Sequence, residues 1–197
     1  MFWSRIAGVY DLIEKVYNGK CNERTTDFVA SLMQQNDSVL ECACGTGMFS
    51  VKIAPKVQRL TAMDFSEGML KKARKKCRKQ NNVLMQEGDI THLRYAENSF
   101  DKAVAANVIH LLDDPKAVIS ELERVVKPGG QIIIPTYIYE EDWAIRLFNK
   151  LGANYKRHFN EKTYEDFFKN MGVERVYFRT CQGRMPCKVA VFENPEE

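Results

Sequence analysis

Four acidic or amide side chains recur through the first half of the chain, each close after an apolar run. Glu41 follows Val39-Leu40, and Asp64, Asp89 and Asn107 follow the next three runs. Such groups exchange hydrogen bonds with a ligand, and carboxylates also attract cations. If the runs are parallel strands, their carboxyl ends meet at the edge where open α/β sheets bind ligands. Each residue alone could be a turn or cap residue, but together they predict an acidic ligand pocket.

The stretch from Glu41 to Gly47 lies between the first apolar run and a helical pattern. Gly45 and Gly47 permit positive φ and a close approach of a ligand to the backbone. The turn lacks the last glycine of GxGxxG, because Ser50 stands there, and it lacks the Gly-Lys-Ser/Thr of a P-loop. An acid such as Asp64, after the second run, can hold two ribose hydroxyls. The turn therefore predicts a nucleoside ligand with little phosphate, and an ordinary strand-to-helix turn is the alternative.

Strand and helix patterns alternate through the middle of the chain. Strands are expected at 39–42, 59–63, 83–86, 100–106 and 131–137, and helices at 48–55, 66–80 and 115–126. This alternation predicts an α/β fold with a doubly wound, mostly parallel sheet.

The two ends of the chain carry different patterns. Helices at 143–151 and 163–171, the latter with Thr163 as a potential cap, precede strands at 174–179 and 188–192. These strands would form an antiparallel C-terminal hairpin and bring the sheet to about seven strands. Helices at 2–17 and 23–33, separated at Asn18-Gly19, precede the first strand and form either a packing layer or a lid.

Length and composition favour one domain of 197 residues. We divide it into an N-terminal helical lid (1–36), a cofactor-binding core (37–137) and a substrate cap with the last strands (138–197).

The net charge of +3 does not indicate nucleic-acid binding, and the basic run 71–79 is interpreted as a solvated helix face. The six cysteines show no paired CxxC spacing, so we expect no metal site and a reducing, cytoplasmic location. No apolar run suits a membrane span or a signal peptide.

Taken in order, these motifs resemble those of the class I S-adenosylmethionine-dependent methyltransferases, most closely the UbiE-like (methyltransferase type 11) group. The matching segments are 39–47, 62–70, 88–90, 99–110 and 122–130. Tyr10-Asp11 is similar to the N-terminal Tyr-Asp of UbiE-like members. Ala43 replaces the family's first glycine, and we expect a modest backbone adjustment to accommodate it.

The resemblance implies a Rossmann-like transferase that uses S-adenosyl-L-methionine as cofactor. It implies that Asp64 holds the ribose hydroxyls, Asp89 accepts from the adenine amino group, and Asn107 presents its carbonyl near the sulfonium. The glycine turn would underlie the methionine part, with Glu41 ordering the turn and Tyr10 closing over the site. The implied cofactor-binding residues are Tyr10, Glu41, Ala43, Gly45, Gly47, Asp64, Phe65, Met69, Asp89, Ile90 and Asn107.

The acceptor side is less defined. His110 is the best candidate for a general base, if the nucleophile must lose a proton, and a structural histidine is the alternative. Tyr137 and Tyr139 could line an acceptor pocket. His92 is interpreted as a surface or turn residue, and His158 as facing solvent, with a substrate contact as the alternative.

No Asn-Pro-Pro-Tyr or Asp-Pro-Pro-Tyr follows the fourth strand, which argues against methylation of nucleobases or glutamine amides. We therefore expect methyl transfer to a small-molecule or lipophilic acceptor, with no nucleic-acid partner and with the oligomeric state open. A non-catalytic nucleoside- or cofactor-binding module is one alternative. An NAD-dependent oxidoreductase, which would require the missing glycine, is the other.

Overall fold

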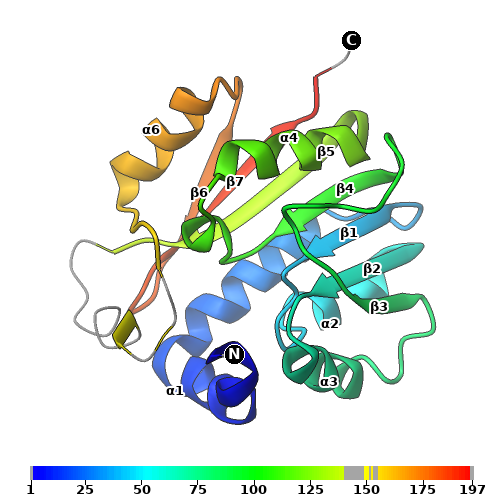
Figure 1. The fold of residues 1–197 in the computed structure, drawn as a ribbon, viewed down its shortest axis with the longest axis vertical. Helices are drawn as coiled ribbons and strands as arrows, with labels where there is room; N and C mark the ends of the chain where they lie inside the picture. The colour runs from blue at the N-terminus through cyan, green and yellow to red at the C-terminus, as the bar shows by residue number, and fades with distance from the viewer. Residues whose placement is uncertain (1, 140–148, 151, 153–154, 196–197) are drawn as a thin grey trace.

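The computed structural model describes residues 2–139, 149–150, 152 and 155–195 (Figure 1). Within them a seven-stranded sheet has the order β3-β2-β1-β4-β5-β7-β6. Its strands are β1 (Ser38–Cys42), β2 (Arg59–Asp64), β3 (Val83–Glu87), β4 (Phe100–Ala105), β5 (Val126–Tyr137), β6 (Tyr177–Cys181) and β7 (Cys187–Glu193). The predicted α/β fold with about seven strands is confirmed.

The first five strands are parallel, and the last two are antiparallel to their neighbours. Ile132, Ile133 and Ile134 of β5 are fully buried, as expected for a strand that is covered on both faces. The C-terminal hairpin places β7 against β5, with Ile133 opposite Val191, and leaves β6 at the edge. Between Val126 and Gln131 the pairing of β5 with β4 shifts register, so the predicted break at Lys127–Gly130 appears as an irregularity within one strand.

Helices cover both faces of the sheet (Figure 1). They are α1 (Phe2–Ser31), α2 (Ser50–Ile53), α3 (Glu67–Lys76), α4 (Pro115–Val125) and α6 (Glu161–Met171), with 3-10 turns η1 (Ala54–Lys56) and η2 (Ile109–Leu111). The N-cap residues Ser66 of α3 and Asp114 of α4 each accept a hydrogen bond from a backbone N–H in the first turn of their helix. In α6 the predicted cap was wrong, because Asn160 is the N-cap and Thr163 completes a capping box with it. Most of the helix predicted at 143–151 lies outside the described residues.

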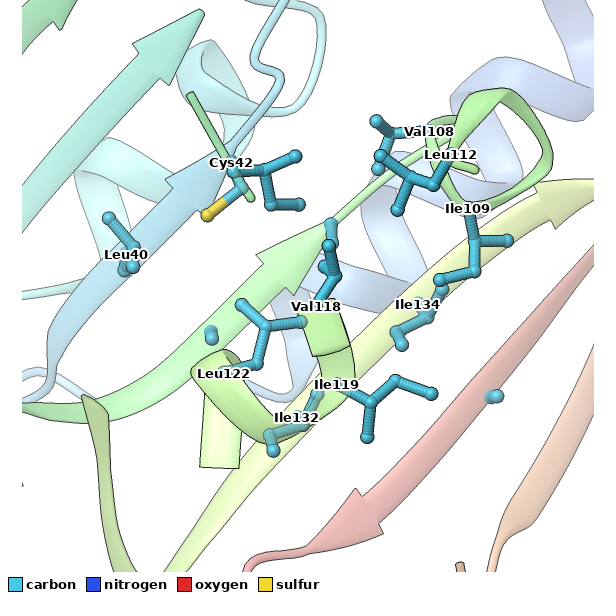
Figure 2. Packing of buried hydrophobic residues seen from close by; sticks show 14 of the residues in the cluster. Leu40, Cys42, Val108, Ile109, Leu112, Val118, Ile119, Leu122, Ile132 and Ile134 are labelled. Carbon is cyan, nitrogen blue, oxygen red and sulfur yellow. The ribbon is translucent and has the colours of Figure 1, made fainter. Parts of the chain in front are cut away.

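Two apolar layers fix the sheet between these helices. On one face Val118, Ile119 and Leu122 of α4 lie over Ile132 and Ile134 of β5 (Figure 2). On the other face, residues of α1, α2 and α3 pack on β1 and β2. The carboxyl ends of the strands are thereby held at fixed positions, which is the requirement for a ligand site built there.

Element α1 consists of two helices that meet at a kink, which confirms the separation predicted at Asn18-Gly19. The backbone leaves helical geometry only at Asn18 (φ −136°, ψ 20°), and the helix then resumes. The Asn18 side chain explains this kink, because its Nδ2 donates to the Met185 carbonyl at 2.6 Å and its Oδ1 accepts from the Met185 N–H. Beyond the kink, Cys21 is fully buried and its thiol donates to the Cys181 carbonyl. The second half of α1 is therefore fixed to the β6–β7 hairpin.

The described segments contain no helix that is both long and apolar enough to cross a membrane.

Candidate functional site

A change in strand order locates the site. From β1 the chain adds β2 and β3 on one side, then crosses to add β4 and β5 on the other. Ligands of open α/β sheets bind outside the carboxyl ends of the strands at such a switch point. The end of β1 leads into the turn 43–47, and Asn107 lies just after β4. The predicted turn and the predicted amide therefore flank the crevice.

The turn after β1 has alternating left-handed residues. Ala43, Gly45 and Gly47 have φ values of 53°, 55° and 81°. The modest backbone adjustment that we expected at Ala43, relative to a glycine, stays a prediction. The alanine keeps the conformation that favours glycine, at a cost of about 1–2 kcal/mol. The surrounding hydrogen bonds, such as Cys44 N–H to the Met63 carbonyl at 2.9 Å, hold the turn in this shape.

The two glycines of the turn are needed for different reasons. A Cβ on Gly47 would lie 3.1 Å from both Cα and Cβ of Ala73, so this glycine lets α3 approach closely. A Cβ on Gly45 would have no atom of the described residues within 4 Å. The backbone at Gly45 thus faces open space, which leaves room for a ligand against the main chain.

Asp64 shapes this turn from the end of β2. Its Oδ2 accepts from the Gly45 N–H at 2.8 Å, and its Oδ1 accepts from the Ser66 N–H at 2.9 Å. Only 5% of the residue is exposed, and burial raises the pKa of its carboxyl despite these two bonds. Asp64 therefore joins the turn to the start of α3, and its oxygens retain lone pairs for a further donor.

Glu41 lies beneath the turn. Its Oε2 accepts from the Ser50 hydroxyl at 2.6 Å, while its Oε1 has no hydrogen-bond partner among the described residues. Burial raises the pKa of Glu41 to about 8; the Ser50 bond opposes this rise and the charge of Asp64 adds to it. At neutral pH the side chain is therefore mostly protonated, and its role is to brace the start of α2.

A cavity of about 560 Å³ opens between the ends of β2 and β3. Its lining residues are Met63, Phe65, Gln86, Glu87, Gly88, Asp89, His92, Arg94 and Tyr95. Of the predicted cofactor residues, Phe65 and Asp89 line it, whereas Met69 and Ile90 are buried. Asp89 also accepts from the N–H and the hydroxyl of Thr91, both at 2.8 Å.

Sequence reasoning missed part of this cavity wall. Gln86, Arg94 and Tyr95 were not singled out. His92 is exposed, as predicted, and also lines the cavity. Gln86 donates to the Tyr95 hydroxyl, so the strand and the following loop are joined there. Only the proximity of these residues to Asp89 along the chain could have indicated them.

The ends of β4 and β5 are joined by Asn107. This residue is also left-handed (φ 51°), and its side-chain oxygen accepts from the Tyr137 N–H at 3.1 Å. The Tyr137 hydroxyl points to α1, where it lies 2.8 Å from Glu14 Oε2 and 2.6 Å from Asn22 Oδ1. Tyr137 is therefore buried against α1, whereas Tyr139 is half-buried and stacks on His158.

His110 is enclosed by the segment that precedes α6. Its ring stacks on Tyr155 at a centroid distance of 4.8 Å, and its carbonyl accepts from the Lys156 N–H. Burial, and secondarily the charge of Arg157, lowers the pKa of His110 to about 3. The buried ring stacked on Tyr155 fits the structural alternative for His110, and the general-base role stays a prediction.

The first half of α1 contacts the turn after β1 through the side chain of Asp11. Asp11 Oδ1 accepts from the Thr46 hydroxyl at 2.5 Å and from Lys76 Nζ at 2.7 Å. The carboxylate of Asp11 therefore joins α1 both to the turn and to α3. The side chain of Tyr10, predicted to close over the site, lies outside the described residues.

Within the described part of the chain, no group of three or more His, Cys, Asp and Glu side chains is arranged to hold a metal ion.

Comparisons with known proteins agree with this geometry. A family model described as a methyltransferase domain matches residues 40–134. The demethylmenaquinone methyltransferase of Listeria welshimeri is 31% identical over 137 residues, which cover 66% of this chain and 58% of that relative. The chain thus matches less than two thirds of the length of this curated relative.

Solved structures share the fold. A SAM-dependent methyltransferase from Thermotoga maritima superposes with a TM-score of 0.73 at 20% identity, covering 98% of each chain. The [4+2]-cyclase SpnF reaches the same TM-score at 18% identity, covering 88% of this chain and 82% of its own. These likenesses concern the fold, and the cyclase shows that one fold serves more than one reaction. The methyltransferase-domain match over residues 40–134 and the 31% identity to the Listeria relative show that this chain belongs to the class I methyltransferase family.

Proposed function

We propose that the protein transfers a methyl group from S-adenosylmethionine to a small, lipophilic acceptor. The observation that carries this proposal is the turn after β1, where Gly45 presents open backbone at the switch point of the sheet. A ligand with a long, flexible, phosphate-free part can lie directly on such a turn.

The residues present fit this cofactor. The methionine part would lie along Ala43, Gly45 and Gly47, and the adenosine would occupy the cavity between β2 and β3. There Phe65, with 42% of its surface exposed, offers an aromatic face to the adenine, and Asp89 offers a carboxylate to its amino group. Asp64 would accept from the ribose hydroxyls while keeping its two backbone bonds.

When bound, the cofactor supplies a methyl group already activated by the positive sulfonium. The residues of the chain then need mainly to orient the acceptor and to exclude water. Asn107 fixes the spacing between the ends of β4 and β5, because its backbone and side chain bond to both Pro135 and Tyr137. We propose Tyr139 as the acceptor-side contact and Tyr137 as its support, with His110 holding the neighbouring segment.

The proposed acceptor class rests on two supports. The listeria relative is named for a lipophilic quinone acceptor. The described wall near Tyr139 is aromatic, because His158 and Phe159 lie beside it. We also propose a reducing, cytoplasmic location, since all six cysteines are free thiols.

A pair of glycine variants tests the cofactor site. Gly45→Ala places a methyl group where the cofactor would lie, while Gly172→Ala makes the same change at the C-cap of α6. Both glycines have positive φ and open space around the added Cβ, so both variants should lose about 1–2 kcal/mol of stability. Calorimetry with S-adenosylhomocysteine should show at least about 10-fold weaker binding for Gly45→Ala alone.

Two outcomes would contradict the proposal. Equal binding of S-adenosylhomocysteine by the two variants would mean that the ligand does not lie on the turn. Binding of NADH in place of S-adenosylhomocysteine would indicate an oxidoreductase. Tight binding without transfer of a labelled methyl group to any quinone, phenol, thiol or amine would favour the non-catalytic module.

A further inference from the structure

Helix α3 and the residues after it carry a dense basic surface. The exposed side chains are Lys71, Lys72, Arg74, Lys75, Lys76, Arg78 and Lys79. Arg74 pairs with Glu67 at 2.6 Å and Lys76 pairs with Asp11 at 2.7 Å. Among the described residues the other five form no ion pair, so most of this charge is not neutralised within the protein.

An apolar ridge lies on the adjoining helix. Leu12 and Val16 of α1 are 65% and 75% exposed, and Tyr17 beside them is 38% exposed. Leu12 and Val16 are four residues apart and therefore lie on one side of the helix. The exposed Lys15 stands between them in sequence, so a cation also borders the ridge.

The two surfaces adjoin one another. The Asp11–Lys76 ion pair links α1 directly to α3, and the two helices lie side by side at the bottom of Figure 1. Asp11 also contacts Thr46 of the turn, so this combined surface lies beside the proposed cofactor site. We call it the basic–apolar face, comprising Leu12, Val16 and Tyr17 with the basic residues of 71–79.

We propose that the basic–apolar face docks the protein on an anionic lipid surface. Lysines attract the negatively charged headgroups, and the aliphatic side chains of Leu12 and Val16 enter the interfacial region. Two of the acidic side chains near the face, Asp11 and Glu67, are each paired with a cation of α3. The carboxylate of Glu14, between Leu12 and Val16 in sequence, accepts hydrogen bonds from Asn22 and Tyr137 instead.

The aliphatic ridge favours a membrane over a nucleic acid. A nucleic-acid surface calls for cations interleaved with stacking aromatic groups. Tyr17 is the one aromatic member of this face, and its more exposed apolar side chains, Leu12 and Val16, are aliphatic. Docking here would bring the site to the phase in which a lipophilic acceptor resides. This purpose rests on the proposed function, but the docking itself does not.

Vesicle binding of two charge-matched variants tests the proposal. The first replaces Lys71, Lys72 and Lys75 by glutamine. The control replaces Lys116, Lys162 and Lys169, which are exposed on α4 and α6. Each variant changes the net charge from +3 to 0, because three lysines are removed in each. None of these lysines makes an ion pair among the described residues, so both proteins should fold.

Co-sedimentation is measured with phosphatidylcholine vesicles, with and without phosphatidylglycerol, in the absence of cofactor and acceptor. The unmodified protein should bind only the anionic vesicles and should be released by salt. The first variant should bind about 100-fold more weakly, since each basic residue near the surface contributes roughly 5-fold, and the control should bind nearly normally. Leu12→Ser with Val16→Ser should also weaken binding, most clearly at high salt.

Equal losses in the two lysine variants would overturn the proposal, as would failure of the unmodified protein to bind anionic vesicles. Binding to single-stranded RNA that the first variant loses, without vesicle binding, would assign the face to nucleic acid instead. Because no turnover is measured, a failed methyl-transfer assay would leave this result unchanged.

Discussion

Replacing Glu41 by glutamine should change how the stability of the protein depends on pH. The folded state holds the pKa of Glu41 at about 8, against an ordinary value of 4.5. Between these pH values the unfolded chain releases a proton that the folded protein keeps. The free energy of unfolding of the unmodified protein therefore falls as pH rises through this window, and the full contribution is present only below about pH 4.5.

The size of this effect follows from the shift. Each pKa unit corresponds to about 1.4 kcal/mol, so the whole window amounts to about 5 kcal/mol. Glutamine mimics the protonated side chain and has no proton to release. The stability of Glu41→Gln relative to the unmodified protein should therefore increase by about 1.4 kcal/mol per pH unit across the window, and then level off.

Urea unfolding followed by circular dichroism at several pH values between 5 and 9 would measure this difference. Glu97→Gln is the matched control, because Glu97 is exposed and its replacement should give a profile parallel to that of the unmodified protein. Parallel profiles for Glu41→Gln as well would refute the reasoning, since they would mean that Glu41 is ionised in the folded state. Comparing variants cancels the titration of all other groups.

Three further changes have defined outcomes. Lys102→Met would leave the buried Asp37 without the cation now 2.8 Å away, and denaturant unfolding should show a loss of about 3–5 kcal/mol, much of it recovered by adding Asp37→Asn. Ala43→Gly should relieve the left-handed alanine and raise stability by up to about 1 kcal/mol in thermal melts, and a decrease would show that the alanine is unstrained there. His110→Phe should keep the stack on Tyr155 and leave the pH profile of kcat unchanged, whereas loss of an acidic limb would identify His110 as a base.

The sheet could be predicted because its signals are local. A run such as Ile132-Ile133-Ile134 has no place except a strand covered on both faces, and the structure confirms this. Likewise Ser66 and Asp114 were identifiable as helix starts, because a cap acts within one turn of its own chain.

The environment of the site residues could not be predicted in the same way. The burial of His110 depends on Tyr155 and Arg157, which reach it from a distant segment. The bond from Thr46 to Asp11 joins residues 35 positions apart, and no periodicity encodes it. Residue types predict candidate members of the site, but the protonation and the partners of these residues depend on tertiary packing.

The kink at Asn18 divides α1 into two units that should open independently. Beyond the kink Cys21, Thr25 and Val29 are buried in the body of the protein, whereas the described contacts of the first half include the polar bonds of Asp11 and Glu14. Because the helical geometry is interrupted between them, the first half can fray without unravelling the second. In native-state hydrogen exchange the amides before Asn18 should therefore exchange by local opening, and those after it only with global unfolding.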